Sequence, residues 1–501
     1  MTEPSVPGAA PPAASAADAE HRLHPMSWLF VLLAQLRQFI VPLVALLILG
    51  RGDRNELWPL LGVGLLAAYS AWQYFTYRYG IAGDALVIRQ GVLERSLRVI
   101  PFARIHNVAV QQSLLHRLFG VAELRLESAG GQKPEAEMRV LRLDQALALE
   151  TLVRSRGAAP VAGAAAAEPG TVLLALPPAE VVRLGLVSNR GMVVLAAAFG
   201  AAWQVSPDLL PGLFESWGRA LFGWAGAQAF GALEYALAAA SLAAAFVLLL
   251  RALSVGLALL QYHGFELREH GRRLTVERGL LARWRTSASR RRIQAWTLRE
   301  GVLHRLLARR SLQVDTAVSA EQQQRALREL APIAPPATCD ALVAHLLPRG
   351  GWPALPWQPL PVRHWWRLWL PSIPFALAVA TALAWRFGGW GLLALAWLPW
   401  SAFAARQHAR RLAWSIAGEL VAVRGGWWSR WWRFAELDKL QALQLLRSPL
   451  DRRCGTATLA LDTAGAPATA PPLRIRFLPL AQARALHAQL GRELARRPLR
   501  W

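Results

Sequence analysis

Long apolar runs alternate with polar, arginine-rich segments along the chain. A helix needs about 20 apolar residues to cross the hydrocarbon core of a bilayer, and runs of about this length occur in three pairs. The pairs are 28–50 with 57–76, 191–206 with 234–258, and 365–385 with 390–405. The pattern therefore predicts six transmembrane helices arranged as three hairpins.

The polar segments that follow the hairpins carry a different pattern. Short runs that alternate apolar and polar residues, separated by glycines, are typical of antiparallel strands. Each segment then ends in a stretch of helical period, at 143–153, 320–330 and 478–496. Strands followed by one amphipathic helix predict a small α+β domain after each hairpin.

The three polar segments are copies of one another. Residues 86–126 align without a gap to 274–314 after a shift of 188, and to 421–461 after a shift of 335. Gly91, Gly279 and Gly426 coincide, and each is followed by two apolar residues. Further coincident sets are Arg95, Arg283 and Arg430; Arg117, Arg305 and Arg452; and His116, His304 and Asp451. Such a repeat means that three domains share one fold.

The repeat also accounts for the stretch GGWWSRWWRF at 425–434, which aligns with GVLERS and GLLARW in the other copies. It is therefore predicted to form a folded strand hairpin. Trp427, Trp428, Trp431 and Trp432 would face the bilayer, another domain or a partner protein.

The residues Arg104-Ile105-His106-Asn107-Val108, followed by the segments 113–122 and 128–130, carry a resemblance to a known family. The chain resembles the bacterial pleckstrin-homology (PH) membrane proteins of the YdbS/YdbT type. This resemblance implies that each domain has two packed antiparallel sheets capped by a C-terminal helix. Copy two departs from the pattern, with Gly301 at the serine position and Ala308 at the glycine position.

The predicted domain order combines these patterns. It comprises a Pro/Ala-rich disordered tail at 1–24, transmembrane hairpin 1 at 25–76, PH-like domain 1 at 77–155, a linker at 156–183, hairpin 2 at 184–260, PH-like domain 2 at 261–350, a linker at 351–363, hairpin 3 at 364–405 and PH-like domain 3 at 406–501.

Charge sets the expected orientation of the chain. There are 56 Lys and Arg residues against 32 Asp and Glu residues, a net charge of +24, and the positive charge is concentrated in the large polar segments. By the positive-inside rule these segments and both termini are expected to be cytoplasmic. The predicted location is the bacterial inner membrane, crossed several times.

Catalytic and metal-binding motifs give no support to the common enzyme classes. The sequence has no Gly-rich phosphate loop, HExxH motif or Gly-x-Ser-x-Gly motif. Cys339 and Cys454 are far apart and have no metal-ligand spacing, so neither a disulfide nor a zinc site is expected. Because Asp451 replaces His116 and His304 in the third copy, a surface or turn role is expected at this position. We therefore predict a non-enzymatic protein without a cofactor.

The candidate contact residues are arginines and tryptophans. Arg95, Arg283 and Arg430 can bind lipid phosphate, or they can pair with a carboxylate or lie at a solvated strand edge. The run Arg290-Arg291-Arg292 is expected to adhere to an anionic membrane surface. Nucleic acid is disfavoured because the domains are tethered to a membrane.

These features predict an interaction platform. Its partner would be a membrane protein, including a smaller PH-domain membrane protein, or an anionic phospholipid surface. One alternative is a transporter of a small solute or lipid through the six helices, which requires a polar path. Another is a lipid-modifying enzyme, which requires a clustered acid and base.

Overall fold

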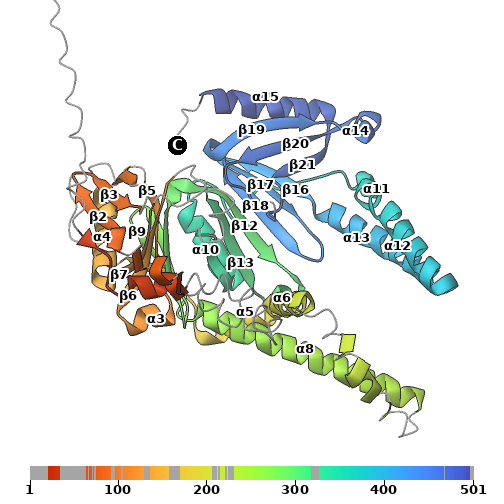
Figure 1. Ribbon diagram of the computed structural model, residues 1–501. Coiled ribbons are helices and arrows are strands. Elements are labelled where there is room, and N and C mark those ends of the chain that lie inside the picture. Colours follow the sequence, from red (N-terminus) through yellow and green to blue (C-terminus); the bar gives the residue numbers. More distant parts are fainter. Residues whose placement is uncertain are drawn as a thin grey trace, which may run out of the picture. The chain divides into compact units, whose positions relative to one another are not determined.

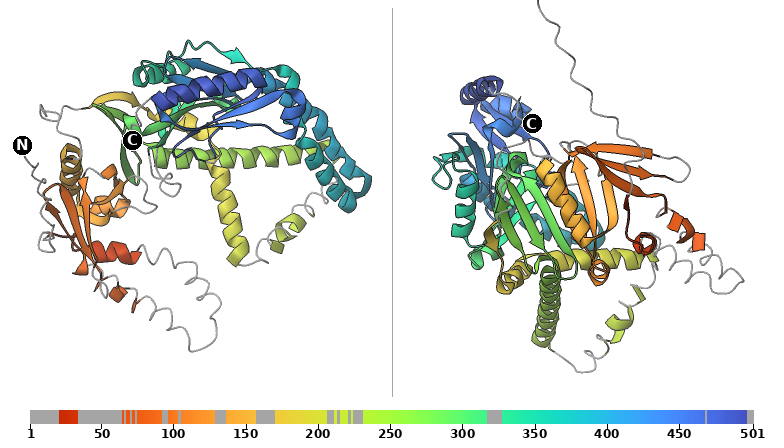
Figure 2. Two further views of the ribbon diagram at one scale, coloured as in Figure 1. Left: turned by 90° about the horizontal axis from the view of Figure 1, so that it is seen from above. Right: turned by 90° about the vertical axis from the view of Figure 1, so that its left-hand side faces the viewer.

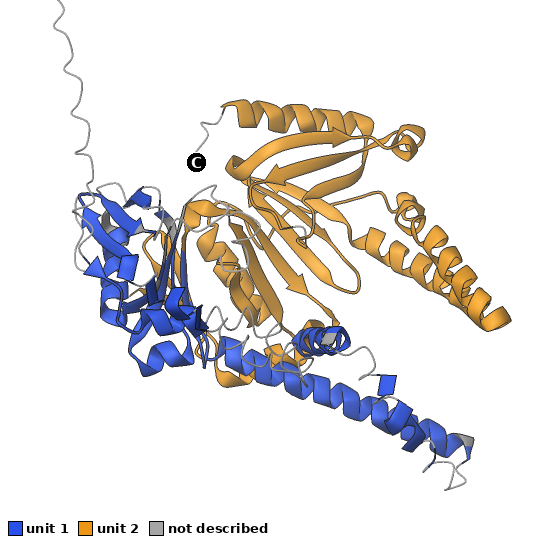
Figure 3. Cartoon of the chain, viewed as in Figure 1, with its two compact units in different colours: residues 1–169, 189–263, 277–287 blue, residues 170–188, 264–276, 288–501 orange. Residues whose placement is uncertain are grey.

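The computed structural model describes residues 21–33, 64–91, 96–102, 105–128, 136–156, 170–205, 211–223, 231–316 and 327–496, except for 66, 70, 73–74, 213–214, 221–222 and 468. These residues belong to two compact units (Figure 3). Unit 1 comprises residues 1–169, 189–263 and 277–287, and unit 2 comprises 170–188, 264–276 and 288–501.

Unit 1 contains the first predicted PH-like domain, built from two antiparallel sheets. The first sheet has the order β1 (His21–Arg22), β2 (Arg78–Ala82), β3 (Ala85–Gln90) and β4 (Ser96–Pro101). The second contains β5 (Ile105–Gln112), β6 (Val121–Ser128) and β7 (Ala136–Arg142), with residues 283–287 of β11 (Arg283–Ser289) beside β5. Helix α3 (Leu114–Leu118) joins β5 to β6, and α4 (Leu143–Arg156) closes the domain. Leu86, Leu124 and Met138 form a core with Leu149 and Val153 of α4.

Unit 2 contains a seven-stranded antiparallel sheet. Its order is β14 (Glu329–Ala334), β13 (Arg310–Thr316), β12 (Ile293–Glu300), β18 (Arg430–Glu436), β17 (Leu420–Gly425), β16 (Ala413–Ala417) and β15 (Gln358–Pro359). A second sheet has the order β19 (Leu440–Leu446), β20 (Thr456–Thr463) and β21 (Arg474–Pro479). Figures 1 and 2 show α15 (Leu480–Arg496) lying across this second sheet, where Leu486 and Leu490 enter the core.

Unit 2 also contains several shorter elements. They are β8 (Thr171–Ala175), α5 (Pro178–Val187), β9 (Glu266–His270), most of β10 (Arg273–Arg278), the 3-10 helix η4 (Arg290–Arg292), α9 (Val302–Leu306), α10 (Pro336–Leu346), the 3-10 helices η5 (Val362–His364) and η7 (Leu437–Lys439), and α14 (Pro449–Cys454). Some elements of the two units lie in the predicted tail or linkers: β1 in 1–24, β8 and part of α5 in 156–183, and β15 in 351–363.

The sequence repeat has a structural counterpart in the strands. β4, β11 and β18 are equivalent, and so are β5, β12 and β19. The register of the latter three shifts at equivalent places, between Ile105 and Asn107, Ile293 and Ala295, and Leu440 and Ala442. A bulge retained in three copies is typical of one fold used three times.

One predicted helix of the repeat was wrong. In copy two, helical period was assigned to 320–330, but Glu329 and Leu330 begin strand β14, and the helix after this strand is α10. Residues 317–326 lie outside the described part of the chain. The prolines decide the boundary: Pro332 disfavours a helix interior, whereas Pro336 occupies the first turn of α10, where no amide bond is lost.

The second departure of copy two does not change its turn. Ala308 adopts φ +49°, close to the +63° of Gly120 and the +64° of Gly455 at equivalent positions. The left-handed conformation is therefore kept, although a side chain makes it unfavourable.

The membrane segments are confirmed in part. Among the described residues, Leu233–Tyr262 within α8 (Ala232–Tyr262) and the segment Val362–Arg411 are long and apolar enough to cross a membrane. A third is present if α5 and α6 (Arg190–Val205) form one broken span. The predicted six helices in three pairs are therefore not confirmed. Most of the first pair, including 34–63, lies outside the described residues.

The third membrane segment contains several helical elements. They are α11 (Trp366–Trp369), α12 (Ser372–Phe387), the 3-10 helix η6 (Gly388–Ala396) and α13 (Trp397–Arg411). Figures 1 and 2 show α12 and α13 extending together from the sheet that contains β16. Gly391 of η6 approaches the backbone of α12 so closely that a Cβ atom there would lie 2.1 Å from the Ala384 nitrogen.

Candidate anion-binding site beside the third membrane segment

The tryptophan-rich stretch forms a strand hairpin, in which a tight turn joins β17 to β18. Gly426 adopts φ +81°, and a Cβ atom at this position would lie 1.8 Å from the Ser429 carbonyl oxygen. The equivalent Gly279 has φ +112° and would place a Cβ atom 1.9 Å from the Ala282 oxygen. The repeated glycine is therefore required by the turn, because only glycine combines this φ with so close an approach.

Both described turns of this kind lie beside a membrane segment. In unit 2, the ring centroid of Trp427 is 5.9 Å from that of Trp400 and 5.3 Å from that of Phe403, both on α13. In unit 1, the amides of Gly279 and Leu280 donate hydrogen bonds to carbonyls near the end of α8. In the two described turns, the residue after the repeated glycine, Leu280 or Trp427, thus contacts a membrane helix.

The four tryptophans of the hairpin separate into two pairs. Trp427 packs on α13, and Trp428 is 60% exposed at the tip of the turn. Trp431 and Trp432 lie on β18, where the guanidinium carbon of Arg310 is 4.8 Å from the Trp432 ring centroid. The tip pair therefore lies beside the membrane segment, whereas Trp431 and Trp432 lie on the sheet.

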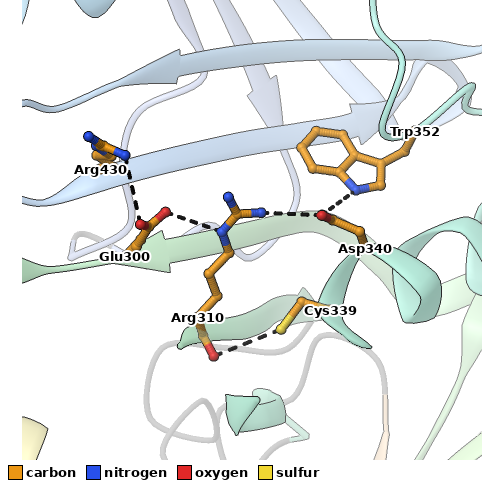
Figure 4. A network of polar contacts seen from close by, with 6 residues as sticks. All are labelled: Glu300, Arg310, Cys339, Asp340, Trp352 and Arg430. Carbon is orange, nitrogen blue, oxygen red and sulfur yellow. Dashed lines mark hydrogen bonds and ion pairs between the residues drawn. The ribbon is translucent and has the colours of Figure 1, made fainter. Parts of the chain in front are cut away.

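The recurring arginine is paired in the third copy. Arg430 lies 3.8 Å from Glu300, which also binds Arg310 at 3.1 Å. Figure 4 shows the network that continues from Arg310 to Asp340 and Trp352. Arg283, at the equivalent position, is exposed, and Arg95 lies outside the described residues. The ion pair supports the structural alternative for Arg430.

The run Arg290–Arg292 lies at the other end of β12 from the tryptophan turn. Arg290 binds Glu269 at 3.1 Å and the Leu346 carbonyl at 2.5 Å. Burial and repulsion from Arg273 lower the pKa of Arg292 to about 10, whereas Arg291 is exposed. The eight residues of β12 separate this run from the turn by roughly 25 Å, at about 3.3 Å per residue. The two predicted sets of membrane contacts therefore lie at opposite ends of the sheet.

A pocket of about 370 Å³ adjoins the tryptophan turn within unit 2. Four basic side chains line it, namely Arg299 of β12, His408 of α13, and Arg474 and Arg476 of β21. The other lining residues are Leu412, Ser429, Trp431 and the segment 469–472. None of its described lining residues is a carboxylate.

Two arginines of this pocket are repelled by other arginines. Burial, with repulsion from Arg474, lowers the pKa of Arg476. Burial and repulsion from Arg328 and Arg433, opposed by attraction from Asp315, lower the pKa of Arg299. Arg299 donates a hydrogen bond to the Thr469 carbonyl at 2.9 Å, but its buried Nε has no acceptor. Because arginine stays protonated in proteins, the pocket carries uncompensated positive charge and suits an anion.

The residues of this pocket were not predicted from the sequence. They come from four separate segments of the chain, so no single stretch of the sequence contains them. One signal was available: in Arg474-Ile475-Arg476 the alternation places both cations on one face of a strand and the buried isoleucine on the other.

A second feature was noted in the sequence but not assigned a role. Arg117 donates a hydrogen bond to the Leu280 carbonyl at 2.8 Å, and its equivalent Arg305 donates to the Trp428 carbonyl at 3.0 Å. In each case an arginine of one copy holds the helix-adjacent turn of the next copy.

Repeated antiparallel sheets closed by a helix, combined with segments able to cross a membrane, define a membrane protein with PH-like domains. Comparison with known proteins gives the family. The chain belongs to the bacterial PH domain family, which matches residues 29–157, 221–338 and 367–494. It is 22% identical over 422 residues to the UPF0699 transmembrane protein YdbT of Bacillus subtilis (strain 168), covering 80% of this chain and 84% of the relative. No solved structure matches.

Proposed function

We propose that the chain is a non-enzymatic platform anchored in the bacterial inner membrane, with its termini and PH-like domains in the cytoplasm. We propose further that the basic pocket of its third PH-like domain binds the phosphate group of anionic phospholipids. The observation that carries this proposal is the gathering of Arg299, Arg474, Arg476 and His408 around a pocket without a described carboxylate.

The position of the pocket favours a lipid over a free anion. His408 lies in the last turn of α13, which also carries Arg410 and Arg411. The neighbouring Trp428 projects from the turn that packs on the same helix. Basic residues beside the end of a membrane helix are favoured on the cytoplasmic side, where each contributes on the order of 1 kcal/mol of attraction to anionic lipid.

The chemistry of the site supports binding without catalysis. Guanidinium groups form paired, charge-assisted hydrogen bonds to phosphate oxygens. The nearby carboxylates Glu300 and Asp315 are engaged by Arg310 and Arg433, so they are not placed as free bases. The relative's description as a transmembrane protein supports the membrane setting.

Native mass spectrometry of the full chain in detergent tests this proposal. Wild-type protein is titrated with phosphatidylglycerol, phosphatidylcholine or inorganic phosphate, and the bound species are counted. We expect phosphatidylglycerol to be retained in preference to the other two. Arg476→Gln should weaken that retention roughly tenfold or more, since hydrogen bonds to charged groups contribute about 1.5–3 kcal/mol.

Arg349→Gln is the matched control. The Arg349 side chain is 82% exposed and lies beside Glu419, at the end of β17 away from the tryptophan turn. Equal loss in both variants would reject the pocket in favour of general surface charge. Binding of inorganic phosphate as strong as that of phosphatidylglycerol would identify a soluble anion as the ligand. A stoichiometric protein partner, with no preference among lipids, would favour a protein scaffold instead.

A further inference from the structure

Two equivalent strand junctions link consecutive copies of the repeat. In unit 1, β11 of copy two pairs with β5 of copy one, with Arg283 opposite Gln112. In unit 2, β18 of copy three pairs with β12 of copy two, with Arg430 opposite Glu300. These two residue pairs occupy the same positions in the repeat, so both junctions have one register.

The same repeat leaves two strands at the ends of their sheets. β4 is the copy-one equivalent of β11 and β18, and within the described residues its neighbour is β3 alone. β19 is the copy-three equivalent of β5 and β12, and its described neighbour is β20 alone. Within the described residues, β4 therefore lacks a neighbour equivalent to β5 or β12, and β19 lacks a neighbour equivalent to β11 or β18.

Burial differs sharply between the paired strands and these edges. At the β12–β18 junction, Trp296 is 3% exposed and Phe434 is fully buried. Their equivalents at the edges are Leu443, which is half-buried, and Val99, which is 44% exposed. Leu97 of β4 is 43% exposed. Exposed apolar residues on an open strand edge are a template for pairing with another chain.

Charged residues at the two edges are complementary. Within the β12–β18 junction, Arg433 donates to the Thr297 hydroxyl at 3.0 Å and binds Asp315 at 2.6 Å, with both charged side chains buried. The equivalent of Arg433 is Arg98 on β4, and the equivalent of Asp315 is Asp462 on β20, beside β19. Both equivalents are exposed. The arginine of the buried ion pair thus has an exposed equivalent on β4, and the aspartate has an exposed equivalent beside β19.

The arginine that hydrogen-bonds to the turn of the following copy also lacks its partner in copy three. Arg117 and Arg305 each bind the turn of the following copy. Their copy-three equivalent, Arg452, is exposed, and its side chain makes no hydrogen bond or ion pair to another described residue. A turn to receive it would come from a further copy of the repeat.

We infer that the chain associates head to tail with a second copy of itself, through antiparallel pairing of β4 in one copy with β19 in the other. Transfer of the internal register places Leu97 opposite Leu445, Arg98 opposite Gln444 and Val99 opposite Leu443, with Arg98 reaching Asp462. This inference goes beyond the proposed lipid site and uses none of its residues.

Charge exchange in the full chain tests the pairing. Self-association in detergent is measured by analytical ultracentrifugation over a range of concentrations, for wild type, Arg98→Glu, Asp462→Arg and an equimolar mixture of the two variants. We expect wild type to associate and each single variant to weaken association at least tenfold. The mixture should recover association, because each edge then meets an opposite charge.

Arg291→Glu is the control, since it makes the same charge change at an exposed position away from both edges, and it should associate like wild type. Thermal unfolding of each variant establishes that it is folded. A wild type that stays monomeric at all concentrations would overturn the inference, as would single variants that associate normally. Failure of the mixture to recover association would overturn it as well, because the loss would then not arise from this ion pair.

Discussion

The β12–β18 junction and the basic pocket beside it are both rich in arginine, but they differ in whether these arginines form ion pairs with carboxylates. At the junction, Arg433, Arg310 and Arg430 each meet a carboxylate. In the pocket, Arg476 is repelled by Arg474, and Arg299 is repelled by Arg328 and Arg433 against the attraction of Asp315. Where arginine serves the fold of this domain it is paired within the chain, so the unpaired group is the one expected to bind an external anion.

The largest expected effect comes from breaking the junction. Arg433→Met leaves Asp315 buried without its partner, and loss of one member of a buried ion pair costs about 3–5 kcal/mol. Chemical denaturation of the detergent-solubilised chain should show this loss. The double variant Arg433→Met with Asp315→Leu should recover most of it, because no buried charge then remains alone. An undiminished stability in the single variant would show that the pair does not hold the junction.

A smaller effect is expected at the ion pair that ties the third membrane segment to its domain. Burial opposes the charged form of Asp451, but hydrogen bonds from Ser448, Arg367 and Thr456 outweigh it and lower the pKa of Asp451 to about 2. A carboxylate with a lowered pKa adds stability above its unfolded pKa near 3.8, and this stability is lost as pH falls toward 2. The shift corresponds to about 2 kcal/mol.

Asp451→Asn should therefore destabilise the chain at neutral pH and differ much less from wild type near pH 2. Denaturation curves at several pH values measure this convergence. A difference that is independent of pH would mean that lost packing, rather than lost charge, causes the defect.

Removal of an arginine from the pocket should change the folding stability much less than removal of an arginine from the junction. Arg476→Gln removes repulsion with Arg474 and leaves no partner unsatisfied, so we expect stability to change by less than about 0.5 kcal/mol, as for substitutions that break no structural contact. Thermal unfolding in lipid-free detergent makes this measurement. A loss comparable with that of Arg433→Met would place Arg476 among the structural arginines.

The smallest effect is expected for the arginine run that stands out in the sequence. Arg291→Gln changes an exposed residue at the far end of β12, so stability and phosphatidylglycerol retention should both stay at wild-type values. Parallel measurements on Arg291→Gln and Arg476→Gln decide which arginines bind lipid. Weaker phosphatidylglycerol retention in Arg291→Gln alone would show that Arg290–Arg292, and not the pocket, contact the lipid.

The sequence predicted the fold well where the chain repeats itself. The gapless alignment placed Gly91, Gly279 and Gly426 together, and their positive φ values explain why glycine recurs there. It failed for the helix of copy two, because the glutamine-rich stretch has helical period while the prolines after it set the true boundary. Helical period alone does not show where a strand interrupts it.

The candidate site was harder to predict, because charge density along a sequence differs from charge density in space. Arg290–Arg292 are adjacent in the chain but are partly engaged by Glu269 and the Leu346 carbonyl. Arg299, His408 and Arg476 are far apart in sequence and meet only because β12 joins the sheet of the next copy. Strand pairing between copies cannot be read from any one segment.

Photocrosslinking with a phosphatidylglycerol analogue that carries its reactive group on the headgroup tests directly whether the basic pocket binds lipid. The full chain in phosphatidylglycerol-containing nanodiscs is irradiated, and the modified peptides are identified by mass spectrometry. We expect modification within 408–412, 429–431 and 469–476, and we expect this modification to be lost in the double variant Arg299→Gln with Arg476→Gln. Modification confined to 290–292, or spread evenly over the basic surface, would contradict this expectation.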